Sequence, residues 1–470
     1  MGFDDDYEHQ SPLLDGEASS SWSEESDEPV VVRTGTVWTA MAHIITGVIG
    51  AGVLSLAWSV AQLGWIAGPL AILIFAAITV VAANLLIDCY RAPHPELGPK
   101  RNRSYMEAVR LLLGDKSAAV AALFMQESLY GAGVTYTITA ANSIRAIQKS
   151  NCYHRQGHQA ACSYGDGVSM LMFGALQIFV SQIPDFHSME WLSVLSAVMS
   201  FTYAFIGLGF GLAKVIENGT IKGSLGGVST SSTASKLFLA FQALGDMACA
   251  YPFSIIVLEI QDTLKSPPSQ NKTMKKAAKF ATLVTTFFYL CCGCFGYAAF
   301  GNATPGNMLT GFGFYEPYWL VDFANACIVL HLVGGYQVFA QPVFAFAERG
   351  MRKKFPNNSF INQVHTLKLP FLFPVQISVL RLCFRTLYVV STTGVAMLFP
   401  YFNQVLGLLG GLNFWPLCIY FPIRMYTAQK KIQPWSSQWL ALQVFSIFCF
   451  CVAAVAFIGS IEGVISARFG

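Results

Sequence analysis

Among the ionisable side chains inside the long apolar stretches of this 470-residue chain, four are candidates for chemistry: His43, Glu127, Asp246 and His331. An acidic side chain near the centre of a membrane-spanning helix costs about 2.5–3.5 kcal/mol on insertion scales, so it is kept there for a partner or a task. Asp246 is the strongest candidate, because it can bind a cationic ligand group or take up and release a proton. The alternative is a structural carboxyl bonded to freed backbone N–H groups.

The two intramembrane histidines are candidates for moving or sensing a proton, because neutral imidazole titrates near physiological pH. His43 precedes Gly50 by seven residues, or two helical turns, so both residues lie on one face of the same helix. For His43 and for His331, a packing histidine held by hydrogen bonds is an equally supported interpretation.

Other polar side chains at the same depth are Glu127, Tyr130 one turn later, and Asn325. Glu127 either contacts a substrate or a proton path, or bonds within the helix bundle. We find no phosphate-binding loop, no His/Cys cluster with metal-ligand spacing and no nucleophile–base signature in the sequence. We therefore expect no enzyme activity, no metal, no cofactor other than a coupling proton, and no nucleic-acid partner.

The elements that must position these residues are membrane helices. The chain is 54% hydrophobic and 12% charged, whereas ordinary soluble proteins are about 25% charged. Lipid offers no partner to exposed backbone groups, so long apolar stretches must cross it as helices. We predict an all-α polytopic membrane protein of about eleven transmembrane helices, near residues 36–59, 63–89, 118–147, 167–183, 190–212, 237–261, 278–300, 318–347, 378–399, 402–423 and 436–461.

Two of these spans contain helix-weakening residues near their middle. The first holds three glycines within residues 46–54, and the sixth holds Gly245, Asp246 and Pro252. The two breaks are five spans apart, which predicts a five-plus-five inverted repeat, and paired broken helices mark the midplane binding site of transporters. Close helix packing through small residues is the alternative explanation.

A helix unwound at Ile49, Gly50, Ala51 and Gly52 frees backbone N–H groups, and the following half-helix directs its positive end at the gap. A carboxylate fits there, and the freed carbonyls of both broken spans suit an ammonium group. The breaks therefore predict a site for an amino acid zwitterion that needs no charged side chain.

Charge distribution predicts the orientation. Residues 1–28 contain ten acids and no Lys or Arg, so we expect no cleavable signal peptide and a disordered, cytosolic acidic tail over residues 1–34. Lys and Arg concentrate in loops 90–117, 262–277, 348–377 and 424–435, which the positive-inside rule places in the cytosol. An odd number of spans then places the C-terminus outside the cell.

The predicted outward loops carry two possible modification sites. Cys152 and Cys162 form either a disulfide or two free thiols in the loop after the third span, and Asn218 begins a glycosylation sequon. The predicted organisation is the tail at 1–34, a first repeat at 35–213, an extracellular loop at 214–236, a second repeat at 237–425, and an eleventh helix with a short extracellular C-terminus at 426–470.

Five segments resemble the plant amino acid permeases of the amino acid/auxin permease family, within the amino acid-polyamine-organocation superfamily. They are residues 47–58 (GVIGAGVLSLAW), 62–65 (QLGW), 259–263 (EIQDT), 292–300 (CGCFGYAAF) and 331–337 (HLVGGYQ). The resemblance implies proton symport of neutral or more varied amino acids across the plasma membrane, with an endomembrane location as the alternative. Other cargo such as auxin, or a receptor that does not transport, are the alternative functions.

Carried over by position, the resemblance assigns Gly50 and Gly52 to the unwound substrate-binding segment and Asp246 to the acid of the sixth helix. It likewise assigns His43 and His331 to the family's intramembrane histidines. This chain departs from the pattern at Cys249, where an aromatic residue is expected, so we expect a reshaped side-chain pocket.

Overall fold

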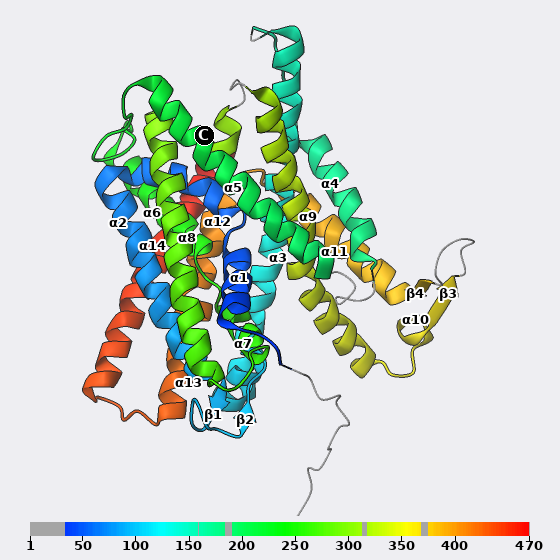
Figure 1. Cartoon of the computed structure of the whole chain (residues 1–470). Helices are drawn as coiled ribbons and strands as arrows, with labels where there is room; N and C mark the ends of the chain where they lie inside the picture. The colour runs from blue at the N-terminus through cyan, green and yellow to red at the C-terminus, as the bar shows by residue number, and fades with distance from the viewer. Residues whose placement is uncertain (1–32, 158, 184–189, 313–316, 368–374, 470) are drawn as a thin grey trace, which may run out of the picture.

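The computed structural model describes residues 33–157, 159–183, 190–312, 317–367 and 375–469 (Figure 1). The predicted acidic tail lies outside the described residues except for its last two positions. The α-helices are α1 (Val37–Val48), α2 (Gly52–Asp88), α3 (Tyr105–Gln156), α4 (Asp166–Ser181), α5 (Glu190–Asn218), α6 (Thr233–Ala250), α7 (Ser254–Asp262), α8 (Gln270–Phe300), α9 (Tyr318–Lys354), α10 (Ser359–Asn362), α11 (Val379–Leu398), α12 (Phe402–Asn413), α13 (Phe421–Lys430) and α14 (Ser437–Phe469).

Shorter elements complete the described chain. Two 3₁₀ turns cover Gly301–Ala303 and Met308–Phe312, and a π-helical turn at Phe414–Tyr420 joins α12 to α13. Antiparallel strands pair β1 (Arg91–Ala92) with β2 (Lys100–Arg101) and β3 (Val364–Leu367) with β4 (Val375–Ser378).

The eleven predicted spans all fall on helices within the described residues. Eight helical segments are long and apolar enough to span a membrane, and α1 and α4 are shorter apolar helices. The 37-residue α2 bends at Gly64, whose φ of 84° divides the end of the first span from the second. The 52-residue α3 bends likewise at Gly114 and contributes the third span. The prediction of an all-helical polytopic membrane protein is confirmed.

Gly64 needs to be glycine for two reasons. Its left-handed backbone disfavours any L side chain, and a Cβ there would approach the Leu225 carbonyl oxygen and the Gly227 nitrogen closer than any real contact. The tight turn sets the angle between the first and second spans.

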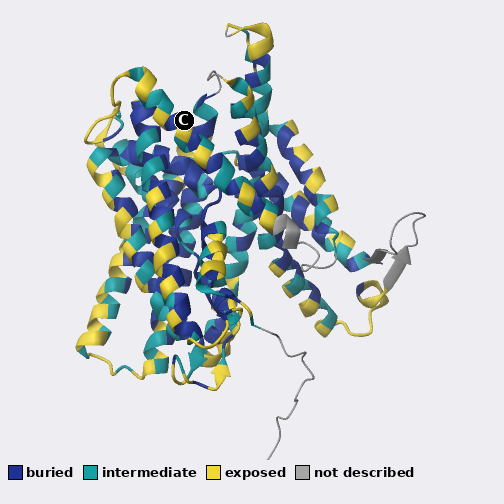
Figure 2. Ribbon diagram, viewed as in Figure 1, coloured by how far each residue is buried: buried dark blue, intermediate teal, exposed yellow. Residues whose placement is uncertain are grey.

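Buried residues gather along the bundle axis, and exposed residues lie on loops and on the outer faces of helices (Figure 2). Helix α2 packs against α6 and α8, whereas α9 packs against α3 and α5. Large apolar side chains such as Leu70, Phe179 and Val444 are exposed on the outer helices. Such faces suit a hydrocarbon surrounding.

The two ends of the described chain lie at opposite ends of the bundle. Figure 1 places the first described residues near α7 and the strand pair β1–β2, at what we call the N-terminal end, and the C-terminus at the other. The structure joins Cys152, in the last turns of α3, to Cys162 by a disulfide. The side-chain amide of Asn218 donates to the Ala299 carbonyl at 2.9 Å.

Candidate functional site

The first helix break separates α1 from α2 at Ile49, Gly50 and Ala51. Ile49 leaves the helical region with ψ at 87°. The N–H groups of Val53 and Leu54 donate to the Gly50 and Ala51 carbonyls, at 3.4 and 3.2 Å. Because a helix start has no preceding carbonyls for its first donors, the break exposes N–H groups around Ala51 and Gly52.

The second break lies at Tyr251, Pro252 and Phe253, between α6 and α7. Pro252 ends the helix because it lacks an N–H and clashes with the preceding turn. The prediction that Gly245 and Asp246 weaken this span is wrong, since both lie inside the unbroken α6. A Cβ on Gly245 would lie 2.5 Å from the Gly407 carbonyl oxygen, so this glycine allows α12 to approach α6 closely.

Tyr289 on α8 connects the two breaks. Its hydroxyl lies 2.8 Å from the Val48 carbonyl, which ends α1, and 2.8 Å from the Ala250 carbonyl, which ends α6. The side chain is fully buried. Sequence reasoning missed this residue, although a tyrosine within an apolar span signals a hydroxyl that needs a buried partner.

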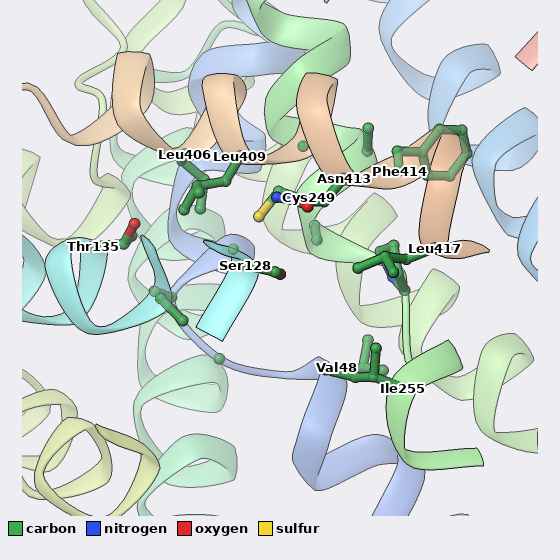
Figure 3. A pocket seen from close by; sticks show the side chains of 18 of the residues that line it. Val48, Ser128, Thr135, Cys249, Ile255, Leu406, Leu409, Asn413, Phe414 and Leu417 are labelled. Carbon is green, nitrogen blue, oxygen red and sulfur yellow. The ribbon is translucent and has the colours of Figure 1, made fainter. Parts of the chain in front are cut away.

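A cavity of about 150 Å³ lies between the breaks, α3 and α12 (Figure 3). Its walls are backbone at the breaks and mostly apolar side chains elsewhere. None of the described residues that line it is Asp, Glu, Lys, Arg or His. The lining residues are Gly47, Val48, Gly50, Ala51, Gly52, Ser128, Ala132, Thr135, Tyr136, Ala248, Cys249, Ala250, Pro252, Ser254, Ile255, Phe339, Leu406, Leu409, Gly410, Asn413, Phe414, Leu417 and Cys418.

Four of the predicted substrate-binding residues line this cavity: Gly50, Ala51, Gly52 and Cys249. The others that were predicted do not line it: Ile49, Tyr130, Gly245, Asp246 and Asn325. Ile49 and Tyr130 alternate with neighbours that line the cavity, whereas Gly245, Asp246 and Asn325 lie earlier along α6 and α9 than the residues that line it.

The predicted residues outside the cavity are held within the bundle. The Tyr130 ring packs edge-on against Tyr388, with centroids 5.5 Å apart. The Asn325 amide donates to Val321 in its own helix at 2.9 Å. Ile49 is fully buried.

Asp246 lies one helical turn from Cys249, outside the cavity lining, and is fully buried. Its Oδ2 accepts hydrogen bonds from Asn403 Nδ2 at 2.8 Å and from Ser59 Oγ at 3.4 Å. Its Oδ1 has no hydrogen-bond partner in the described part of the chain. One carboxyl group thus holds α2, α6 and α12 together.

His331 faces the first break, whereas His43 does not. The His331 Nδ1 lies 2.8 Å from the Ser196 carbonyl, and because a carbonyl only accepts, Nδ1 donates. Its buried Nε2, unpartnered among the described residues, lies 3.6 Å from where a Cβ on Gly50 would be. His43 lies on the exposed side of α1.

The comparisons with known proteins agree with this architecture. The sequence profile described as "Transmembrane amino acid transporter protein" matches residues 33–466. The chain belongs to this transporter family.

Two relatives of this amino acid transporter family member come from Arabidopsis thaliana. "Probable amino acid permease 7" is 58% identical over 94% of this chain and 96% of its own length. "Amino acid permease 3" is 53% identical over 92% of this chain and 91% of its own length. Among solved structures, the inward-facing conformation of Mhp1 shares the fold, with a TM-score of 0.51, 14% identity and coverage of 93% of this chain and 90% of that one.

A second, wider cavity of about 590 Å³ adjoins the first in this transporter family member. Ile255 and Phe339 line both cavities, so these two side chains stand between the candidate site and the wider space. The charged residues of the second cavity are Glu259, Glu348, Arg349, Arg352, Arg381 and Arg385. These side chains make the second cavity a charged space beside the candidate site.

Proposed function

We propose that this chain is a proton-coupled importer of amino acids, mainly neutral ones, that works by alternating access. The observation that carries the proposal is the cavity between two helix breaks, which offers backbone donors and acceptors but no charged side chain among its described lining. Backbone dipoles at such breaks are complementary to both charges of a zwitterion.

The substrate carboxylate would bind the N–H groups that begin α2, around Ala51 and Gly52, where the helix dipole adds positive potential. The ammonium would bind carbonyl oxygens at the ends of α1 and α6. Each carbonyl has two lone pairs, so Val48 and Ala250 keep accepting capacity beside the Tyr289 hydroxyl.

The half-helices α1 and α7 would move together during alternating access. The N-terminal end of α1 and the C-terminal end of α7 are tied by hydrogen bonds from Gly35 N–H to the Thr263 carbonyl at 2.9 Å and from Lys265 N–H to the Gly35 carbonyl at 3.0 Å. An ion pair from Arg33 to Asp262 at 3.0 Å reinforces them. With a cytosolic N-terminus and an extracellular C-terminus at the plasma membrane, the wide cavity would open to the cytosol.

Asp246 is the proposed coupling group. Its unpartnered Oδ1 can take up a proton, while its Oδ2 contacts residues of α2 and α12. Protonation removes the charge that strengthens those hydrogen bonds, so it can bias the packing of three helices at once. His331, which faces the first break, would set how uptake depends on pH. His43 and Glu127 are secondary candidates for the proton path.

The proposal is tested by uptake of labelled amino acids in a transport-deficient yeast at external pH 5 and 7.5, with and without a protonophore. We expect higher uptake at pH 5, and loss of that gain with the protonophore. Uptake indifferent to the gradient would remove proton coupling, and competition by auxin rather than amino acids would assign a different cargo.

Replacing Cys249 with phenylalanine should narrow the substrate range. The larger ring would fill part of the cavity, so uptake of aromatic amino acids should fall about tenfold or more while alanine uptake changes little. Cys451→Phe is the matched control, because Cys451 is exposed on α14. Equal losses for alanine and phenylalanine would show that Cys249 does not shape the side-chain pocket.

Replacing His331 with glutamine should change the pH profile of uptake rather than abolish it. The amide can still donate to Ser196 but cannot titrate, so the ratio of uptake at pH 5 to uptake at pH 7.5 should shift about threefold or more. His154→Gln, which alters a histidine stacked on Tyr318, should keep the parent profile. An unchanged profile in His331→Gln would assign His331 to packing.

A further inference from the structure

Asn413 is the last residue of α12 and precedes the π-helical turn Phe414–Tyr420. Its side chain is 7% exposed and lines the candidate cavity. Figure 3 shows it reaching from α12 toward Cys249, across the cavity from Val48 and Ile255. It thus lies in the part of the site that a substrate side chain would enter.

The orientation of the Asn413 amide is fixed from behind the cavity wall. Its Nδ2 donates to the Glu127 Oε2 on α3 at 2.6 Å. The amide nitrogen therefore faces Glu127, and the amide oxygen faces elsewhere. Glu127 itself does not line the cavity, and it acts through Asn413 as a positioning residue.

The Asn413 Oδ1 atom is left as an unused acceptor. It is buried and has no hydrogen-bond partner in the described part of the chain. Among the described residues that line the cavity, no other buried side-chain oxygen or nitrogen lacks a hydrogen-bond partner. A buried acceptor without a partner is unfavourable, so a ligand that donates a hydrogen bond there gains affinity.

We propose that Asn413 and Glu127 form a side-chain subsite that selects substrates whose side chains end in a hydrogen-bond donor, such as an amide. The subsite rests on the proposed function, because it reads the side chain of a bound amino acid. Leu409, Leu417 and Phe414 provide the apolar walls around it. A glutamine side chain would pass these walls and donate its amide to Asn413 Oδ1, whereas methionine, of similar length, has no donor.

The test compares glutamine with methionine on purified protein and in uptake. Ligand dissociation constants are measured from the rise in melting temperature with ligand concentration, and inhibition constants from competition with a labelled common substrate. We expect the wild type to prefer glutamine over methionine about tenfold, as sites that hydrogen-bond a substrate group discriminate against analogues without it. Asn413→Leu should lower that ratio to about one.

Two further variants keep the test decisive. Asn413→Leu leaves Glu127 without its partner, so the double variant with Glu127→Gln is measured as well and should give the same ratio near one. Glu127→Gln alone should give an intermediate preference for glutamine over methionine. The side chain of Gln at position 127 can accept or donate a hydrogen bond, so it no longer fixes the orientation of the Asn413 amide. Gln242→Met is the matched control, since Gln242 is a buried amide on α6 with an unpartnered nitrogen outside the cavity.

An unchanged preference in every Asn413 and Glu127 variant that still folds and binds would overturn the subsite while leaving amino acid transport in place. Binding of glutamine without uptake would keep the subsite and remove the transport function. Binding of neither amino acid to the wild type would overturn both.

Discussion

Tyr289→Phe is expected to reduce the maximal rate of amino acid uptake by about tenfold or more, with normal delivery to the membrane. The variant keeps the buried ring and loses only the hydroxyl that lies 2.8 Å from the Val48 and Ala250 carbonyls. Leaving a buried carbonyl unsatisfied costs about 1–3 kcal/mol. Since these carbonyls end the two half-helices that form the site, the loss should change the geometry of both breaks together.

Tyr297→Phe is the matched control for this change. Tyr297 is on the same helix and fully buried, but its hydroxyl bonds to the backbone of Ser224, away from both breaks. Uptake by this variant should stay within about twofold of the parent, because the two hydrogen bonds that it loses lie outside the site. If Tyr289→Phe transports at the parent rate, the hydroxyl does not hold the breaks together.

Asp246→Asn is expected to abolish uptake or reduce it at least about tenfold while surface expression stays intact. An asparagine can present its oxygen to Asn403 and Ser59 and turn its amide nitrogen toward the position of the unpartnered Oδ1. The shape of the site is therefore kept and the titrating group is lost. Removing a carboxyl from the middle of a span also removes an insertion cost, so the variant should fold.

Asp322→Asn provides the comparison for Asp246→Asn. Asp322 lies near the start of α9, where its Oδ2 accepts a hydrogen bond from Asn151 at 2.7 Å. Uptake in this variant should remain close to that of the parent. Surface labelling measures how much of each variant reaches the membrane. If Asp246→Asn takes up amino acids at the parent level, Asp246 serves only in packing and His331 becomes the candidate for the coupling group.

The all-helical membrane fold and the first break could be predicted from the sequence because each depends on local properties. Apolar length sets where helices cross a membrane, and three glycines within residues 46–54 weaken the helix there. A Cβ on Gly52 would lie 3.0 Å from the Ala250 Cα, which is a contact between the two breaks. For Gly52, close helix packing and the helix break at the binding site are therefore the same feature.

The inner details of the site could not be predicted because they depend on contacts between distant segments. An aspartate in a broken span gives the same sequence signal whether it lies at the break or one turn away, as Asp246 does. The roles of Tyr289 and Asn413 follow only from their partners Val48, Ala250 and Glu127, which lie more than 35 residues away in the chain. The spacing of apolar residues in α1 likewise does not show which face of the helix packs against other helices. The exposure of His43 could therefore not be predicted.

We propose that a proton gradient drives amino acids through the cavity between the two breaks. The most direct measurement is the accumulation of a labelled neutral amino acid in liposomes that contain the purified protein, with an acidic exterior as the only gradient. We expect accumulation above the external concentration, collapse of that accumulation by a protonophore, and no accumulation by Asp246→Asn. Equilibration to the external concentration, the same with and without the pH gradient, would contradict it.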